Sequence, residues 1–314
     1  EARPYCECGD LLDVVYPNFV PHLGIVGGPP SLKRTFSKRR DYGNNVYDES
    51  GVWRFRELIN FMGIDTEDFE AMSRVLVSLD GAEGRTRPYQ MTKVANYVGM
   101  NPETLWLQPE GLNPSGSFKD NGMATGYTHA KMIGVRKVIC ASTGNTSASA
   151  AQYGANETVE VEVLTPKDKI APGKFAQPLQ FGAHVREIDG KFDDAMREVL
   201  RRGGYIINSL NPFRIEGQKT MIYRALEHLG WQVPDWFVVP GGNLGNSAAF
   251  GKALTELYRW GFIDRLPRLV VVNSDKANTL YTLYNGHFQG ESLRWNDGNV
   301  NEEHAVPAHH LPLL

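Results

Sequence analysis

Short apolar runs alternate with helical patterns along most of this chain, and this alternation constrains the fold more than any other feature. Strands are predicted for the apolar runs 104–107, 137–140, 159–164, 184–188, 205–207, 236–240 and 268–272. Helices are predicted for the intervening segments 118–132, 147–153, 174–181, 192–202, 216–229 and 247–260. Because parallel strands need long crossover connections, usually helical, this order predicts an α/β protein built on a parallel sheet.

Length, charge and apolar content exclude several broad classes of protein. The 314 residues suggest about two domains, at roughly 150 residues each. A net charge of −3 argues against nucleic acid as the main partner, since such a protein needs a basic excess or patch. No apolar run approaches the ~18 residues that span a bilayer, so no membrane association is predicted. The first eight residues resemble neither a signal peptide nor a transit peptide.

The three cysteines are too few for a disulfide framework, which favours a reducing, cytoplasmic setting. Cys6 and Cys8 are half of a conceivable zinc site, but no second pair of ligands accompanies them, so we predict no metal site. Cys140 ends an apolar run and is predicted to be a small buried residue rather than a nucleophile.

The two ends of the chain carry weaker patterns. Pro29-Pro30 is a turn signal, and the basic stretch 31–40 is typical of a solvated face. Residues 65–69 are acidic and indicate a helix start or a turn. Residues 304–314 contain three histidines but fit no helix or strand template. We expect a frayed or non-native tail there rather than a metal site.

The loops that follow strands are the places where ligands bind in such sheets, and one of them contains a lysine. Asn113-Pro114-Ser115-Gly116-Ser117-Phe118-Lys119-Asp120 is polar, contains glycine and opens into a helix. The positive end of that helix disfavours an ammonium group, so the pKa of Lys119 is predicted to be lowered. A neutral amine is what a lysine nucleophile requires. The alternative is an ordinary solvated surface lysine.

Two further loops of this kind offer anion-binding groups. The loop 142–147 provides hydroxyls, an amide and a helix start, although simple N-capping explains it equally well. The loop 241–246 is rich in glycine, but it is neither a Walker A loop nor a dinucleotide fingerprint. This loop either binds a phosphate ester or is only a tight turn between a strand and a helix. An amine, a polar pocket and a phosphate cradle together suit pyridoxal 5′-phosphate (PLP).

The loops also match a known family in detail. The matching segments are Glu83–Pro88, Asn113–Asp120, Ala141–Ala148, Asn208–Thr220, Trp231–Trp236 and Pro240–Asn246. The chain therefore resembles the threonine synthases, PLP enzymes of the tryptophan synthase β-subunit fold type. The resemblance is good from about residue 74 to residue 272 and weak on either side.

The resemblance implies a fold and a domain organisation. The fold would be two open, twisted, mostly parallel sheets flanked by helices, which is fold type II of the PLP enzymes. Residues 1–107 would form an N-terminal extension and the first part of a large domain, 108–207 a small α/β domain, and 208–314 the rest of the large domain. Threonine synthases continue well past the equivalent of residue 272, so the large domain and its ligand to the pyridine nitrogen would be incomplete. A homodimer is expected by the same resemblance.

The family also implies roles for individual residues. Lys119 would carry the cofactor and transfer protons, Phe118 would pack near the cofactor ring, and Asn145 would hydrogen-bond its phenolic oxygen. The residues implied to bind the cofactor phosphate are Gly242, Asn243, Leu244, Gly245 and Asn246. The residues implied to bind the phosphate and carboxylate of the substrate are Ser142, Thr143, Thr146, Asn208, Ser209 and Arg214.

The implied activity is that of a carbon–oxygen lyase acting on a phosphate ester. It converts O-phospho-L-homoserine and water to L-threonine and phosphate, by γ-elimination followed by β-addition of water. One alternative is a related PLP enzyme, such as a cysteate synthase or a dehydratase-like β-eliminase. A second is an inactive PLP-fold fragment, and a distant third is a nicotinamide-dependent oxidoreductase.

Overall fold

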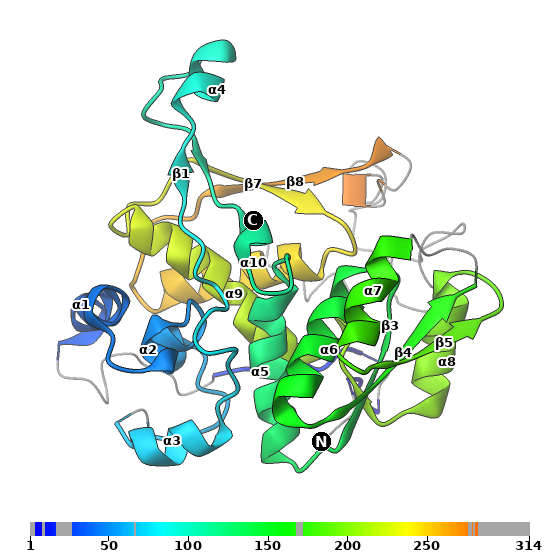
Figure 1. Cartoon of the computed structure of the whole chain (residues 1–314). Coiled ribbons are helices and arrows are strands. Elements are labelled where there is room, and N and C mark those ends of the chain that lie inside the picture. The colour runs from blue at the N-terminus through cyan, green and yellow to red at the C-terminus, as the bar shows by residue number, and fades with distance from the viewer. Residues whose placement is uncertain are drawn as a thin grey trace.

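A four-stranded parallel sheet forms from the central apolar runs, in the order β5–β4–β3–β6. Its strands are β3 (Lys137–Ala141), β4 (Glu160–Pro166), β5 (His184–Ile188) and β6 (Tyr205–Ile206). The computed structural model describes residues 4–7, 10–16, 27–65, 67–167, 172–275, 278 and 280–281. Within these ranges the predicted α/β architecture, with parallel strands joined by helices, is confirmed (Figure 1).

Helices cover both faces of this sheet because the strand side chains alternate between two apolar clusters. Ile139 and Ala141 pack with α8 (Phe192–Arg202) on one face. Val138 and Cys140 point to the opposite face and belong to the main core. That face carries α6 (Asn145–Glu157) and α7 (Pro172–Gln180). Cys140 is completely buried, and burial raises the pKa of its thiol to about 12, so its predicted role as a small core residue is confirmed.

A second parallel pair of strands lies on the other side of the molecule. These strands are β7 (Trp236–Gly241) and β8 (Arg268–Asn273), and they are connected by α10 (Gly245–Arg259). Between this pair and the first sheet lie α5 (Lys119–Met132) and α9 (Pro212–His228), which pack closely against each other (Figure 1). The prediction of two separate parallel sheets is therefore confirmed.

The described residues between 27 and 112 pack beside α9 and α5, for example through Arg54 with Glu227 and through Val77 with Thr128. The elements there are α1 (Gly28–Tyr42), α2 (Val46–Glu49), η1 (Trp53–Leu58) and α3 (Phe69–Val75). They are followed by β1 (Tyr89–Gln90), α4 (Thr92–Tyr97), β2 (Trp106–Leu107) and η2 (Glu110–Leu112). The strands β1 and β2 pair antiparallel, and α4 projects from them away from the rest of the molecule (Figure 1).

One expectation for this region is wrong. Pro29-Pro30 does not make a turn but lies in the first turn of α1, where proline is tolerated because the N–H groups there have no helical partner. The basic stretch 31–40 exposes Arg34, Lys38 and Arg40, as predicted, while Leu32 and Phe36 on the other face of the helix are buried in the core. The acidic segment 65–69 does start a helix, with Asp68 capping α3.

Other predictions fall on residues outside the described ranges. The tail 304–314 and Cys8 lie outside the described residues. Among the residues described, no cluster of His, Cys, Asp and Glu could hold a metal ion. No described helix combines the length and the apolar character that crossing a membrane demands. The boundaries at residues 107 and 207 stay predictions.

Candidate active site

Lys119 is the first residue of α5, at the point where the polar loop becomes helical. Its Nζ lies 4.2 Å from the centroid of the Phe118 ring. Burial, and after it the positive charge of Arg214, lowers the pKa of Lys119 to about 7. The predicted direction of this shift agrees with the structure, and burial and a neighbouring cation are its causes.

This lowered pKa has a measurable consequence. In the PLP-free chain, peptide mass spectrometry measures the rate at which acetic anhydride acetylates Lys119. We expect this rate to reach half its maximum near pH 7. Lys137 is the internal comparison, because its hydrogen bonds to Glu162 and Glu160 raise its pKa. A Lys119 profile that matches that of Lys137 would contradict this description.

The lowered pKa of Lys119 also affects folding. The unfolded chain binds more protons than the folded chain between pH 7 and 10.5, so the contribution of Lys119 to the free energy of unfolding increases as pH rises through that interval.

Arg214 lies on α9 with a completely buried side chain. Its Nη1 donates to the carbonyl of Ile207 at 2.9 Å. Its Nε and Nη2 atoms are buried and have no hydrogen-bond partner among the described residues. Burial lowers the pKa of Arg214 to about 10, so the group remains charged at neutral pH. A buried, incompletely paired cation is costly, and an anionic ligand would compensate it.

The loop 142–147 leads into the start of α6. Ser142 Oγ accepts hydrogen bonds from the N–H groups of Gly144 at 3.2 Å and Ser147 at 3.0 Å, which curls the loop. The residue directly before α6 is Gly144, which has no capping side chain, but Ser142 satisfies one N–H of the first turn, as the alternative of N-capping by Ser predicts. Asn145 is exposed at the first position of the helix. Thr143 and Thr146, on either side of this position, are partly buried.

Asn208 holds this loop in place through its amide. Its Oδ1 accepts from the N–H of Ala141 at 2.9 Å, and its Nδ2 donates to the carbonyl of Ala141 at 2.8 Å. The side chain thus pairs with β3 as a further strand would, directly before Ser142. The structure gives Asn208 a positioning role, and contact with a substrate stays a prediction.

Replacing Asn208 by Ala should lower the free energy of unfolding by about 2–3 kcal/mol, because two buried backbone groups of Ala141 lose their partner. Urea unfolding followed by circular dichroism measures this. Asn156→Ala is the matched control, since the exposed Asn156 amide should contribute no more than about 0.5 kcal/mol. Equal effects of the two variants would show that the pairing with β3 stabilises nothing.

The loop 241–246 has the geometry of an anion cradle. Leu244 adopts a φ of +63°, a conformation that non-glycine residues rarely adopt outside functional loops. A Cβ atom on Gly242 would meet nothing within 4 Å, so the backbone there faces open space. Leu244, the residue directly before α10, makes no side-chain cap, although Asn243 Oδ1 accepts from the N–H of Gly245 at 3.4 Å. Ser247 Oγ is buried without a partner among the described residues and can donate to an oxyanion at this helix start.

Residues 207–209 connect the three predicted loops. Ile207 accepts from Arg214, and Asn208 pairs with the strand before the loop 142–147. Ser209 accepts from Asn243 Nδ2 at 2.6 Å, which joins it to the glycine-rich loop. Residues 208 and 209 therefore join the strand before the loop 142–147 to the glycine-rich loop, and Arg214 lies close enough to Lys119 for its charge to act on that amine.

Two residues important for this arrangement were missed by the sequence analysis. The carboxylate of Asp120 accepts from the N–H of Ser115 at 2.8 Å and from Ser149 Oγ at 2.5 Å, which fastens the lysine loop to α6. Burial raises the pKa of Asp120. The second is Glu110, described below. An acidic residue next to Lys119 was the available signal, since Ser149 and Arg224, the partners on other helices, are distant in sequence.

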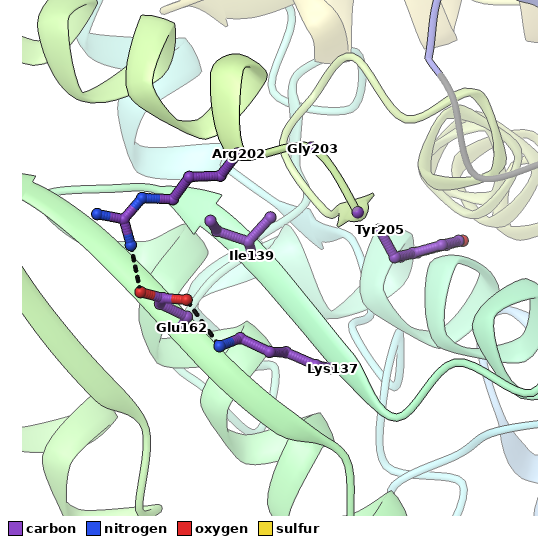
Figure 2. Close-up of a pocket in the computed structure, with 7 residues that line it drawn as sticks. Lys137, Ile139, Glu162, Arg202, Gly203 and Tyr205 are labelled. Atoms are coloured by element: carbon purple, nitrogen blue, oxygen red, sulfur yellow. Dashed lines mark hydrogen bonds and ion pairs between the residues drawn. The ribbon is translucent and has the colours of Figure 1, made fainter.

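A separate hollow lies at the opposite, amino end of the first sheet. Figure 2 shows Lys137 and Arg202 pointing at Glu162 beside this hollow. Glu162 pairs with Lys137 at 2.8 Å, Arg186 at 2.8 Å and Arg202 at 2.6 Å. These charges compensate one another, so the hollow offers no unpaired group to a ligand. The start of α5 remains the candidate active site.

Comparison with known proteins agrees with this site. The family profile described as "Pyridoxal-phosphate dependent enzyme" matches residues 79–303, which include Lys119 and all three loops. The chain belongs to this family. The predicted cofactor, PLP, is thereby confirmed. The half-buried amine, the glycine-rich loop before α10 and the two unpaired nitrogens of Arg214 are compatible with a phosphate-bearing aldehyde.

The individual relatives that match this chain include threonine synthases. The chain is 39% identical over 279 residues to threonine synthase of Methanocaldococcus jannaschii, covering 88% of this chain and 62% of that protein. It is 43% identical over 273 residues to threonine synthase of Methanosarcina acetivorans, covering 86% of this chain and 60% of that protein. The chain thus spans about three fifths of the length of these relatives.

Solved structures of lower identity share the fold alone. Serine racemase from Dictyostelium discoideum superposes with a TM-score of 0.52 at 18% identity, covering 64% of each chain. Maize serine racemase gives 0.50 at 17% identity, covering 64% of this chain and 75% of its own. The predicted PLP-enzyme fold is therefore confirmed.

Proposed function

We propose that this chain carries the cofactor-binding and proton-transferring part of a threonine synthase. The reaction would convert O-phospho-L-homoserine and water to L-threonine and phosphate, as a carbon–oxygen lyase. The observation that carries this proposal is Lys119: a half-buried amine with a pKa of about 7, within reach of the charge of the buried Arg214, in a chain 39–43% identical to threonine synthases.

Lys119 is suited to hold the cofactor and to move protons. When bound, PLP supplies a conjugated ring system that accepts the electrons released when a proton leaves the substrate. With a pKa near neutrality, Nζ of Lys119 can take up a proton in one step and return it in another. Phe118, whose ring lies against this amine, would limit its movement and exclude water from one side.

The two helix starts would divide the anionic groups between them. The loop Gly242, Asn243, Leu244, Gly245 and Asn246 is proposed to bind the cofactor phosphate, because its backbone faces open space at the start of α10. The start of α6, with Ser142, Thr143 and Thr146, is proposed to bind the substrate phosphate, with Asn145 directed to the cofactor. Ser209 lies between the two loops and is proposed to contact the substrate.

Arg214 is proposed to act by its charge. Its buried guanidinium favours an anionic substrate near Lys119 and favours the neutral form of the lysine amine. Both effects serve a reaction in which an anionic amino acid meets a neutral base.

Product analysis separates this proposal from its alternatives. The PLP-loaded chain is incubated separately with O-phospho-L-homoserine, with O-phosphoserine plus sulfite, and with L-threonine. Threonine and phosphate in equal amounts from the first substrate are the expected result. Cysteate from the second or 2-oxobutanoate from the third would favour a related lyase. No product from any of them, with PLP bound at Lys119, would contradict the proposal and favour an inactive fragment. The homodimer and the cytoplasmic setting stay predictions.

A further inference from the structure

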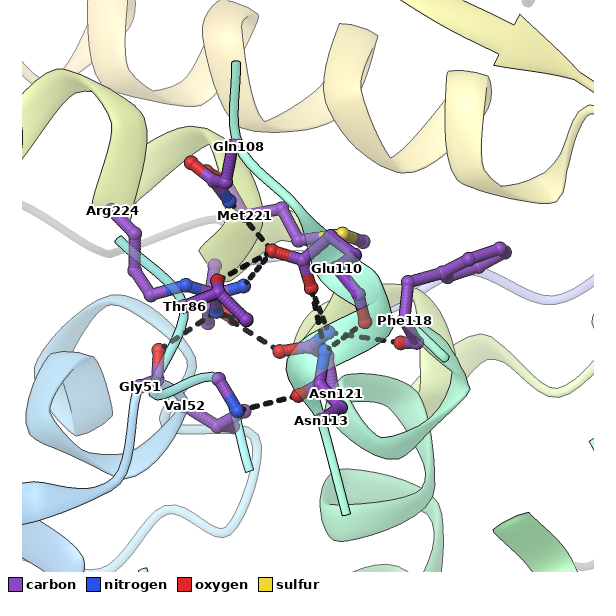
Figure 3. A network of polar contacts seen from close by, with 12 residues as sticks. Gly51, Val52, Thr86, Gln108, Glu110, Asn113, Phe118, Asn121, Met221 and Arg224 are labelled. Atoms are coloured by element: carbon purple, nitrogen blue, oxygen red, sulfur yellow. Dashed lines mark hydrogen bonds and ion pairs between the residues drawn. The ribbon is translucent and has the colours of Figure 1, made fainter. Parts of the chain in front are cut away.

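The carboxylate of Glu110 lies at the centre of a polar network that includes Asn113 and Asn121, the residues on either side of the lysine (Figure 3). Five side chains donate hydrogen bonds to it. The donors to Oε1, each at 2.7 Å, are Thr86, Gln108 and Arg224. The donors to Oε2 are Asn113 at 3.0 Å and Asn121 at 2.9 Å. A carboxylate offers about four lone-pair sites, so its accepting capacity is filled.

The two oxygens of this carboxylate face different parts of the fold. Oε1 faces the body of the protein, where Arg224 of α9 is 1% exposed. Oε2 faces the loop and the first turn of α5, because Asn113 and Asn121 lie on either side of Lys119. Glu110 therefore bridges the segment that carries the lysine to a buried cation on another helix.

The connection from Glu110 to Lys119 passes through Asn121. Asn121 Nδ2 donates both to Glu110 and, at 2.9 Å, to the carbonyl of Phe118, the residue directly before the lysine. Asn121 Oδ1 accepts from Arg224 Nη1 at 2.9 Å. On the other side, Asn113 Oδ1 accepts from the N–H of Gly84 at 2.7 Å. The loop is thus held at both ends by groups that share one carboxylate.

We propose that Glu110 is a positioning residue for Lys119, which keeps the amine half-buried beside Phe118 and Arg214 before any ligand binds. The proposal rests on the assignment of Lys119 as the reactive amine. Burial raises the pKa of Glu110, but Arg224 and the hydrogen-bond donors outweigh it and lower the value to about 2, so the carboxylate is charged throughout the working range of pH. Glu110 itself touches no reacting atom.

Glu110→Gln removes this charge at almost constant volume. Whichever way the new amide turns, its NH2 group faces donors, either Arg224 or the two asparagines. We expect the loop to loosen and Lys119 to become more exposed to water. In the PLP-free chain, the pH of half-maximal acetylation of Lys119 by acetic anhydride should then rise by about one unit or more from its starting value near 7.

The matched control is Glu227→Gln. Glu227 is also buried and pairs with a buried arginine, Arg54, at 2.8 Å, but none of its described contacts is with residues 113–121. We expect this variant to lower the unfolding temperature while leaving the acetylation profile of Lys119 unchanged. Because the measurement needs neither PLP nor substrate, it is independent of whether the proposed reaction takes place.

A second variant decides the question if Glu110→Gln fails to fold. Asn121→Ala breaks the connection to the Phe118 carbonyl and keeps the Glu110–Arg224 ion pair. This variant should also raise the pH of half-maximal acetylation of Lys119. An unchanged Lys119 profile in the folded Glu110→Gln variant, or in Asn121→Ala if the first does not fold, would overturn the proposal and leave Glu110 with a structural role alone.

Discussion

A Lys119→Ala variant should lose covalent attachment of PLP completely and retain the fold. The substitution removes an amine whose pKa is lowered to about 7 and replaces it with a good helix former at the start of α5. If the proposed reaction takes place, its rate should fall by at least about a thousandfold, since no other group at the site would replace the base. The visible spectrum of the PLP-loaded protein and a product assay measure the two effects.

Lys33→Ala is the appropriate control for this variant. Burial lowers the pKa of Lys33 as well, but its amine lies over the ring of Trp231, 5.3 Å from the centroid. We expect its removal to leave both the spectrum and the rate unchanged. Attachment that survives in Lys119→Ala, or that disappears in Lys33→Ala, would contradict the assignment of the reactive lysine.

Gly217→Ala should be the most destabilising single-methyl substitution near the site. Gly217 lies where α9 crosses α5, and a Cβ atom there would come within 1.9 Å of the carbonyl oxygen of Asn121 and 2.5 Å of Thr125 Oγ1. The backbone of α5 must move to accommodate it, so we expect a loss of about 3 kcal/mol in the free energy of unfolding. Because the helix that moves carries Lys119, the affinity for PLP should decrease together with the free energy of unfolding.

Gly251→Ala is a matched control within a helix. A Cβ atom on Gly251 of α10 would meet nothing within 4 Å. There the usual gain from replacing a helical glycine applies, about 0.5–1 kcal/mol in favour of the folded state. Chemical denaturation of both variants tests the comparison. A Gly217→Ala variant as stable as Gly251→Ala would show that the two helices do not cross as closely as described.

Much of this architecture could be predicted because its signals are local. The strands and helices from residue 118 to residue 273 follow from apolar periodicity, and the three loops follow from polar and glycine-containing segments between them. Helix α9 begins at Pro212, four residues before the predicted start, because Asn211 caps it and proline suits its first turn.

What could not be predicted depends on contacts between distant segments. The bond between Arg224 and Glu110 joins residues 114 positions apart, and no local pattern marks either of them. The complete burial of Arg214 and its effect on Lys119 arise only when α9 packs against α5. In the N-terminal part, Pro29-Pro30 is compatible with a turn and with a helix start, and packing of Leu32 and Phe36 decides in favour of the helix.

Lys119 is proposed here as the residue that carries PLP. The most direct test is a visible spectrum of the purified chain with PLP before and after borohydride reduction, followed by peptide mapping of the reduced adduct. We expect an absorbance band that borohydride bleaches, with the label on the peptide that contains Lys119. The absence of such a band, or a label spread over surface lysines, would contradict the account of this site.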